Sequence, residues 1–383
     1  MDRFLQTLMD AIAVGSLYAL IALGYTMVYG ILKFINFAHS DVFVLGAWLS
    51  FVGAGIAGLD PAREASIGPW VFWVLAALWA AAGIAAVYEL VLRPALSRRL
   101  DRRLPAPRWH LNLSLVAAWG SIAVGVLHLA KGAASAGFGF AAGGIILLLA
   151  MMVCGLTGFC IERLTYKPLR RAPRLNVLIT AIGVSLLLQN IGQLNWMFGT
   201  RPDRMPTLLP EAELFTIGTA VRVRLVDVMV VGTAVVLMVV LDWLVFRTKI
   251  GRAMRAVSFS PPNASLMGIN VDRVISFTFV LGAMLAAAAG FLFSQKYPGL
   301  NQTAASGWVL LGLKAFVAAV IGGIGNIRGA MLGGLLIGLL EFFVAQYLPD
   351  GASLRDIFVF GALIVVLLFK PSGVLGKSAT EKV

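Results

Sequence analysis

The sequence predicts an all-α polytopic membrane protein with about 9–11 transmembrane helices and a cytoplasmic loop that couples to other subunits. Of its 383 residues, 60% are hydrophobic and 13% are charged, whereas soluble domains are about half apolar and a quarter charged. The apolar residues form blocks of about 20, the length that crosses about 30 Å of hydrocarbon. The net charge of +13 comes from basic residues in short loops beside these blocks, which indicates membrane topology rather than nucleic-acid binding.

Eleven apolar segments are candidate spans of a single transmembrane domain that covers residues 1–383. The first begins at Leu8 and is too long for a cleavable signal peptide. The second starts among polar residues, and the ninth runs into a glycine-rich stretch, which makes it a candidate re-entrant segment. The segments are 8–31, 35–58, 70–92, 110–130, 140–161, 175–198, 225–246, 274–293, 308–325, 329–348 and 354–370.

The basic residues indicate the orientation of the chain. If the N-terminus lies outside, about two thirds of the 31 Lys and Arg residues face the cytoplasm, as the positive-inside rule requires. This orientation places the loop 247–273 and the C-terminus inside and the loop 199–224 outside. Within that outer loop, the segment Phe215–Val226 is rich in Thr and Val around a Gly-Thr turn, which predicts a small β-hairpin.

Within residues 70–131, we expect the third and fourth predicted spans to form an extra helix pair. The sequence APRWHLNLSLVAAWGS at Ala106–Ser121 is similar to APRLNVLITAIGVS at Ala172–Ser185. One hypothesis is that the third and fourth spans duplicate the fifth and sixth, and the alternative is a chance similarity between loops rich in Pro and Arg. An added pair of spans leaves the orientation of every later span unchanged.

The stretch Gly251–Asn270 lies between two spans and cannot enter hydrocarbon. Charged residues such as Arg252 and Arg255 cost about 2.5–3.5 kcal/mol each at the bilayer centre. The first residues favour a helix, Pro261 interrupts it, and a second apolar piece, Ala264–Ile269, follows. This pattern predicts a short surface helix, a break and a second turn that a soluble partner can grip. The alternative is an ordinary cytoplasmic loop.

The chain carries none of the motifs of a catalytic subunit. It contains no G-x-x-x-x-G-K-[ST], no H-E-x-x-H and no G-x-S-x-G. Its three histidines are scattered, and Cys154 and Cys160 fall on different faces of one predicted helix. We therefore expect no catalytic residue, no metal site and no cofactor in this chain.

Polar side chains at membrane depth are functional candidates, because their burial in hydrocarbon is costly. Asn36, His39 and Asp41 follow the first span and are candidates for lining a passage or fixing a broken helix. The alternative is that they cap a helix terminus. Gln189 and Gln193 share one face of the sixth span, where they either face a pathway or bridge to a neighbouring helix.

Further candidates lie in the C-terminal third. Lys314 falls inside a span, and Glu341 is its nearest membrane carboxylate in sequence. The two either form an ion pair or lie at membrane edges, where lysine snorkels. Gly325 and Gly329 stand four residues apart in GGIGNIRGAMLGGLLIG, which indicates either close helix packing or a hinge.

Four long sequence blocks carry a family resemblance. They are GSLYALIALGYTMVYGILKFINFAHSDVFVLGAWLS from Gly15, IERLTYKPLRRAPRLNVLITAIGVSLLLQN from Ile161, GRAMRAVSFSPPNASLMGINVDRVISFTFVLGAMLAAAAG from Gly251 and GLKAFVAAVIGGIGNIRGAMLGGLLIGLLE from Gly312. In this order they resemble the branched-chain amino acid ABC transporter permeases, specifically the first of that system's two permease types. The resemblance covers most of the chain outside about 60–145.

The resemblance implies a permease subunit of an ATP-driven importer of branched-chain or related amino acids in the bacterial cytoplasmic (inner) membrane. It implies a second, different permease in a heterodimer, two ABC ATPase subunits and an extracytoplasmic substrate-binding protein as partners, besides membrane lipid and no nucleic acid. It also implies that the loop from Gly251 docks on the ATPases. The expected contact residues are Gly251, Arg252, Arg255, Ala256, Ala264, Met267, Gly268 and Ile269.

The sequence alone does not decide the cargo, and it differs from the family's usual sequence at two places. Similar permeases also carry urea, short amides and other small polar solutes. An alternative of another class is an ion-coupled secondary transporter, for which Glu341 is the best intramembrane carboxylate. Ser40 stands where the family usually has glycine, and the segment 258–263 lacks the family's usual acidic residues.

Overall fold

A computed structural model describes residues 2–60, 109–137, 139–170, 172–195, 197–209, 213–217, 221–301 and 303–376, together with a few isolated residues between 73 and 81. Within these residues, nine helices are long and apolar enough to cross a membrane, and a tenth, α13, is shorter. The nine are α1 (Asp2–Leu32), α2 (His39–Ile56), α5 (Trp109–Ser135), α6 (Gly139–Ile161), α8 (Arg174–Gly192), α9 (Leu225–Arg247), α12 (Val271–Lys296), α14 (Ile327–Tyr347) and α15 (Gly351–Phe369), and α13 covers Ser306–Gly322.

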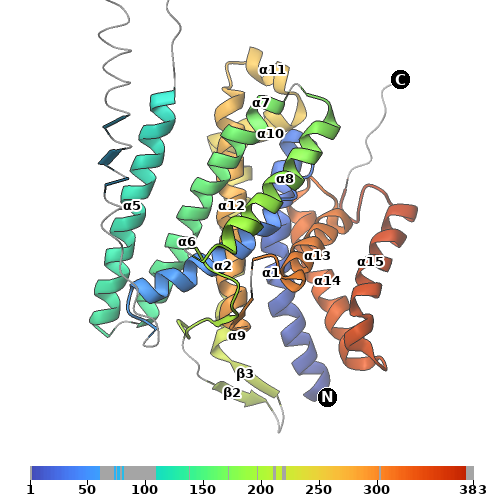
Figure 1. Ribbon diagram of the computed structural model, residues 1–383. Helices are drawn as coiled ribbons and strands as arrows, with labels where there is room; N and C mark the ends of the chain where they lie inside the picture. The colour runs from blue at the N-terminus through green and yellow to red at the C-terminus, as the bar shows by residue number, and fades with distance from the viewer. Residues whose placement is uncertain are drawn as a thin grey trace, which may run out of the picture.

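The predicted all-helical membrane fold is confirmed (Figure 1). Every predicted span except 70–92 coincides with one of these ten helices, and that span lies almost entirely outside the described residues. Of the predicted extra pair 70–131, only the second helix, α5, is described, and it packs along α6. The duplication of this pair therefore stays a hypothesis.

Helix α1 is the centre of the bundle. Its residues from Ala13 to Val28 are all buried, and it packs against α9, α12, α13 and most extensively α14. Small residues make the α1–α14 contact close: a Cβ added at Gly334 would lie 2.4 Å from the Ala19 backbone, and one at Gly338 would lie 2.5 Å from Gly15 Cα. Small residues at a helix crossing allow this backbone-to-backbone packing in membranes.

Helix α12 forms a second buried column beside α1. It packs on α2 and α6 through positions where a larger side chain would clash. A Cβ at Gly46 of α2 would lie 2.4 Å from Ala287 Cα, and one at Gly290 of α12 would lie 2.1 Å from Phe43 O. The early helices and the late helices are therefore interleaved in one body rather than arranged as two sequential halves.

The two ends of the bundle carry different small elements (Figure 1). The end with the N-terminus of α1 carries an antiparallel hairpin of β2 (Glu213–Ile217) and β3 (Val221–Arg224), which confirms the hairpin predicted there. Another pair joins β1 (Asp203–Arg204) to β4 (Gly299–Leu300). The opposite end carries α10 (Lys249–Phe259), α11 (Pro261–Leu266) and the last residues of α15. We call these the hairpin end and the α10–α11 end.

Between α6 and α8, the chain turns through a π-helical segment, Glu162–Tyr166, followed by the short helix α7 (Lys167–Leu169). A π-helical turn inserts one extra residue per turn and often marks a functional position. Here it changes the direction of the side chains that follow α6, so that they meet the start of α12.

Candidate functional site

The α10–α11 element is a helix, a break and a second helix, as the sequence predicts. Thr248 Oγ1 caps α10 by accepting a hydrogen bond of 3.1 Å from Gly251 N. Ser260 separates the two helices and caps α11 just before Pro261, a residue that suits the first turn of a helix. Asn270 caps the following helix, α12, with a bond of 3.1 Å from Arg273 N. Each boundary of the element is therefore marked by a polar cap residue, and Pro261 follows the cap of α11.

This element is fastened to the ends of α1 and α9. A Cβ at Gly251 would lie 2.1 Å from Val245 O, so only glycine allows α10 to fold back so closely on α9. Arg255 Nη1 donates to the same carbonyl at 2.6 Å, and Ser258 Oγ donates to Gly30 O at 2.7 Å. A displacement of α10 must therefore move α1 and α9.

The outward face of the element is apolar at its tip. Phe259, Leu266 and Met267 are 92%, 86% and 83% exposed. Leu266 and Met267 are neighbours in the sequence, and exposed apolar side chains that lie together mark interaction surfaces. Sequence reasoning named only Met267 of these three, because Phe259 and Leu266 fit equally well the buried face of a short helix.

The eight coupling residues named from the resemblance divide into two groups in this element. Arg252, Arg255, Met267 and Gly268 are exposed. The other four are buried or half-buried and shape the element from within: Gly251, Ala256, Ala264 and Ile269. Gly268 has φ of +80°, a conformation that favours glycine, and closes the turn that leads into α12.

Asn36, just before α2, and His39, in its first turn, contact residues of other elements. The N-cap of α2 is Ala38, with no side-chain cap bond. Asn36 Oδ1 accepts a hydrogen bond of 2.7 Å from the Tyr166 hydroxyl. His39 Nε2 lies 3.2 Å from Ile21 O of α1, and its ring packs edge-on against Tyr25.

Asp41 and Gln189 form a polar contact between α2 and α8. Gln189 Nε2 donates to Asp41 Oδ1 at 2.8 Å, and among the described residues the buried second oxygen, Asp41 Oδ2, has no hydrogen-bond partner. Both residues line a cavity of about 220 Å³ whose other walls are mostly apolar. Gln193 instead donates to Gln189 O at 3.3 Å, so its amide stays within the last turn of α8.

The unusual Ser40 is accommodated by a glycine on a neighbouring helix. A Cβ added at Gly312 of α13 would lie 2.1 Å from Ser40 Cβ. The side chain that this sequence adds on α2 therefore occupies the space that Gly312 leaves free. Ser40 Oγ donates to Phe37 O at 3.0 Å and needs no partner from α13.

The ion pair between Lys314 and Glu341 is confirmed, and the alternative of snorkelling is wrong. Lys314 Nζ lies 2.8 Å from Glu341 Oε1 and 2.6 Å from Asp356 Oδ1. The Tyr18 hydroxyl donates to Glu341 Oε2 at 2.6 Å. The side chains of Lys314 and Glu341 are 3% and 6% exposed. Four helices, α1, α13, α14 and α15, therefore converge on one buried cluster.

The glycines after α13 form a turn and a close helix contact, and the hinge stays a prediction. Gly323 and Gly325 have φ of +107° and +95° and form the turn between α13 and α14. Gly329 lies inside α14, where an added Cβ would be 2.3 Å from Gly322 O. Gly325 therefore belongs to the helix break, and Gly329 belongs to the close packing of the two helices that flank it.

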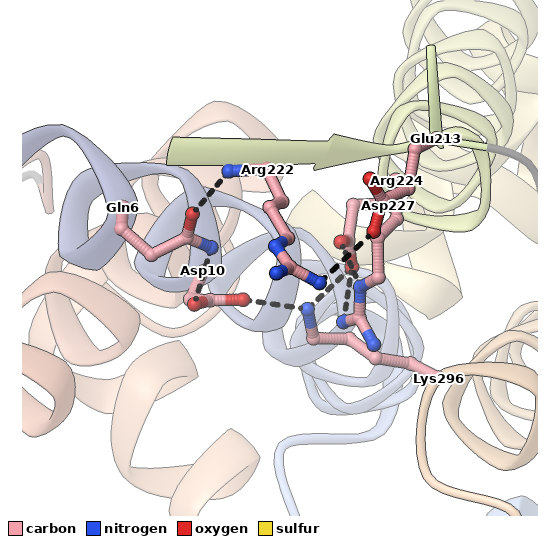
Figure 2. Close-up of polar contacts among 7 residues, drawn as sticks. All are labelled: Gln6, Asp10, Glu213, Arg222, Arg224, Asp227 and Lys296. Carbon is pink, nitrogen blue, oxygen red and sulfur yellow. Dashed lines mark hydrogen bonds and ion pairs between the residues drawn. The ribbon is translucent and has the colours of Figure 1, made fainter. Parts of the chain in front are cut away.

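Sequence reasoning missed a buried ionic cluster at the hairpin end. Figure 2 shows Lys296, at the end of α12, between Asp10 of α1 and Asp227 of α9. Its Nζ lies 2.9 Å from Asp10 Oδ1 and 2.5 Å from Asp227 Oδ1, and the lysine side chain is 1% exposed. Arg224 Nε and Nη2 donate to Asp227 at 2.9 and 3.2 Å. These bonds raise the pKa of Arg224 above its usual value, so its charge is retained.

The same cluster holds the hairpin against α1 (Figure 2). Gln6 Oε1 accepts a hydrogen bond of 3.2 Å from Arg222 N, and Gln6 Nε2 donates to Asp10 at 3.1 Å. Arg222 Nη1 donates to Glu213 across the hairpin at 3.3 Å. The sequence feature that could have indicated this cluster is the position of Lys296 and Asp227 near the ends of two predicted spans.

A second missed cluster lies at the α10–α11 end. Arg170 pairs with Glu162 and, at 2.5 Å, with Asp272 at the start of α12. Lys167 Nζ lies 2.9 Å from Asp272 Oδ2, and Ser276 Oγ donates to Glu162 at 2.6 Å. The cluster connects the π-helical segment to α12, the helix that directly continues the α10–α11 element.

The geometry defines a class of protein: a multi-pass membrane protein with an exposed helix–break–helix element at one end and buried ionic clusters between its helices. Within the described part of the chain, no three His, Cys, Asp or Glu side chains come together as metal ligands do. This architecture is typical of a transport permease.

Comparison with known proteins identifies the family. The family described as "Branched-chain amino acid transport system / permease component" matches residues 7–100 and 111–367. The permease protein BraD of the high-affinity branched-chain amino acid transport system of Pseudomonas aeruginosa is 34% identical over 383 residues, which cover 100% of this chain and 98% of the relative. The corresponding LivH proteins of Salmonella typhimurium and Escherichia coli are 34% and 33% identical, each over 99% of this chain and 98% of the relative. No solved structure matches the chain.

The chain belongs to the family of branched-chain amino acid transport system permeases. It is a permease component of a transport system and not an enzyme. The resemblance of the four sequence blocks is thereby confirmed. Its expected limit was wrong, because the family match also includes residues 60–100 and 111–145.

Proposed function

We propose that this chain imports branched-chain or related amino acids across the bacterial cytoplasmic membrane, driven by ABC ATPase subunits that grip the α10–α11 element. Relatives of nearly full length are named as permeases of high-affinity branched-chain amino acid transport systems, and they come from bacteria. The distribution of Lys and Arg supports an N-terminus outside and a C-terminus inside, which places the α10–α11 element in the cytoplasm.

The observation that carries the proposal is the combination of an exposed apolar tip with a tightly held base. Phe259, Leu266 and Met267 offer a surface for another protein, while Gly251 and Arg255 hold α10 on α9. A partner that contacts this tip differently in its two states shifts the equilibrium between two arrangements of the permease. ATP hydrolysis therefore belongs to partner subunits.

The complete importer would contain further subunits. A second, different permease would form a heterodimer with this chain, two ABC ATPases would bind the cytoplasmic face, and an extracytoplasmic protein would deliver the cargo. The exposed apolar faces of α8, α9 and α15 are available for the partner permease and for membrane lipid.

Several buried polar residues and glycines are candidates for the pathway or for the helix breaks beside it. Asp41 and Gln189 favour such a role most, since they line a cavity and leave one carboxylate oxygen unpaired. The full set is Asn36, His39, Asp41, Gln189, Gln193, Lys314, Gly325 and Gly329.

A second candidate cargo class is another small polar solute, such as urea or a short amide. The autoinducer 2 import system permease LsrC of Yersinia pseudotuberculosis is 29% identical over 215 residues, which cover 54% of this chain. This similarity shows that permeases related to half of the chain serve a different solute. Competition of unlabelled solutes against leucine uptake distinguishes the two.

Charge substitutions at the exposed tip test the coupling. We expect Leu266→Asp and Met267→Asp to abolish leucine uptake and cargo-stimulated ATP hydrolysis in proteoliposomes that contain the assembled transporter. Both side chains are more than four-fifths exposed, so the chain itself should still fold and insert. The matched control is Leu214→Asp, the same change at an exposed position of the hairpin end. Normal uptake by both tip variants would contradict the proposal, as would uptake by the chain alone under an ion gradient.

A further inference from the structure

A cavity of about 360 Å³ adjoins the Lys314 cluster. Tyr18, Trp308, Leu311 and Phe342 form apolar walls, and Lys314, Glu341 and Arg355 supply the charged groups. Small-molecule sites typically have about 300–1,000 Å³, apolar walls and a few convergent polar groups. The cavity therefore has the size and composition of a site for one small ligand.

The charges of the cluster beside the cavity sum to zero. Lys314, Glu341 and Arg355 line the cavity, and Asp356, which does not line it, lies 2.6 Å from Lys314 Nζ and supplies the second negative charge. A ligand with a single net charge would leave an unbalanced charge among apolar walls, which is strongly unfavourable. A ligand that carries one positive and one negative group preserves the balance.

Arg355 is the group that is free to bind an anionic ligand atom. Its Nε lies 3.6 Å from Glu341 Oε1 and 3.9 Å from Asp356 Oδ1, beyond hydrogen-bond distance. Its side chain is 48% exposed, and within the described residues it makes no hydrogen bond. A guanidinium with five unused N–H donors is well suited to a carboxylate, which it can bind in bidentate geometry.

Glu341 is the group that can bind a cationic ligand atom without leaving Lys314 unpaired. Lys314 Nζ contacts both Glu341 and Asp356. If Glu341 Oε1 accepts a hydrogen bond from a ligand ammonium, Asp356 still neutralises the lysine. The second carboxylate therefore makes the exchange possible in a buried setting, where an unpaired charge is costly.

We propose that this cavity binds one aliphatic α-amino acid as a zwitterion. Its carboxylate accepts from Arg355, its ammonium donates to Glu341, and its side chain packs against Trp308, Leu311 and Phe342. This site rests on the proposed amino acid transport and adds to it a place within this subunit where the cargo is held. Segment 297–301, which lines the cavity, follows the hairpin end of α12, so the site lies toward the side proposed to face outward.

The test is saturation-transfer difference NMR on the full-length chain in lipid nanodiscs, with L-leucine as the probe. We expect a saturable signal from L-leucine and much weaker binding of 4-methylpentanoate, which lacks the ammonium, and 3-methylbutylamine, which lacks the carboxylate. Absence of leucine binding to the unmodified chain would overturn the proposal. Equal affinity for leucine and either analogue would overturn the zwitterion assignment.

Two variants locate the binding. Arg355→Gln should weaken leucine affinity by about tenfold or more, since a charged hydrogen bond is lost. Gly307→Trp should abolish binding, because Gly307 lines the cavity and an added Cβ meets only open space there. The matched control is Arg224→Gln, whose side chain is 50% exposed and belongs to the other lysine cluster; its leucine affinity should equal that of the unmodified chain.

Unchanged affinity in both Arg355→Gln and Gly307→Trp would overturn the site. The assay contains no ATPase, so its failure is separable from failure of the coupling proposal. A chain that binds no leucine but loses uptake in Leu266→Asp would retain the proposed coupling without this binding site.

Discussion

Two buried lysines, Lys296 and Lys314, lie in ionic clusters of the same composition that differ in the hydrogen bonds of the arginine. Each is at most 3% exposed and contacts two carboxylates, and each cluster contains one further arginine that is about half exposed. In both clusters the charges of the lysine, the arginine and the two carboxylates sum to zero. The difference is how the arginine is held.

At the hairpin end, the arginine completes the network. Arg224 donates two hydrogen bonds to Asp227. In the bundle interior, Arg355 stays 3.6 Å from Glu341 and 3.9 Å from Asp356 and donates to neither. A closed network fastens segments together, whereas an open one has donors left for a ligand. Four predictions, ordered from the largest expected effect to the smallest, test this comparison.

Lys296→Met should cause the largest loss of stability. It leaves Asp10 and Asp227 close together without their shared cation, and breaking a buried ion pair costs about 3–5 kcal/mol. Unfolding of the purified chain in mixed micelles of increasing SDS content measures the change. Lys249→Met, at an exposed lysine of α10, is the control and should unfold like the unmodified chain. An unfolding midpoint for Lys296→Met that equals this control would show that the closed cluster does not fasten the hairpin end.

Asp227→Asn should cost more than Glu341→Gln. Asp227 has two cationic partners at hydrogen-bond distance, and Glu341 has one, since Tyr18 is neutral. The additional partner of Asp227 is Arg224, which is half exposed, so the two losses should differ by about 0.2–1 kcal/mol. The same SDS titration compares them, and a larger loss in Glu341→Gln would reverse the assignment of the closed and open clusters.

Tyr18→Phe should have a moderate effect, about 1–3 kcal/mol, because Glu341 Oε2 loses its one donor among the described residues while remaining buried. Phenylalanine keeps the ring that lines the cavity, so the change isolates the hydroxyl. Combining it with Glu341→Gln in a double-mutant cycle measures the coupling between the two residues. Strict additivity would mean that the hydroxyl does not act through Glu341.

Arg224→Gln should have a small effect on stability and Arg355→Gln the smallest, because water reaches both half-exposed side chains and Arg355 pairs with Glu341 and Asp356 only at 3.6 and 3.9 Å. The Arg224 pair is half exposed, and such pairs contribute about 0.2–1 kcal/mol. Arg355 has no hydrogen bond to lose in the described chain. Thermal denaturation of the two purified variants in parallel tests this order. A larger loss of stability in Arg355→Gln would indicate that Arg355 stabilises the fold.

The features that could be predicted from the sequence are those that depend on neighbouring residues. Spans follow from apolar blocks, the break in the α10–α11 element follows from Pro261, and the hairpin follows from a short Thr- and Val-rich segment around a turn. The Lys314–Glu341 pair could be predicted because both charges lie in apolar runs with few other charges. In each case the residues that determine the feature lie close together in the sequence, or few other residues of the same type could take their place.

The features that could not be predicted depend on distant partners. Asn36 and Asp41 look like caps because their partners, Tyr166 and Gln189, are more than a hundred residues away. Lys296 and Asp10 are separated by 286 residues, and nothing in either local sequence indicates the other. The exposure of Phe259 and Leu266 was equally hidden, because an apolar residue on a short helix is compatible with a buried face.

The burial of α1 has a consequence for how the protein is made. A chain emerges from the ribosome N-terminus first, so α1 enters the bilayer long before its main neighbour α14 exists. Until Glu341 and Gly334 have been synthesised, Tyr18 has no carboxylate to bind and Ala19 has no glycine against which to pack. Helix α1 therefore waits for its most extensive neighbour until α14 has been made, and a nascent chain that stops after α13 leaves the α14-facing side of α1 turned toward lipid or a chaperone.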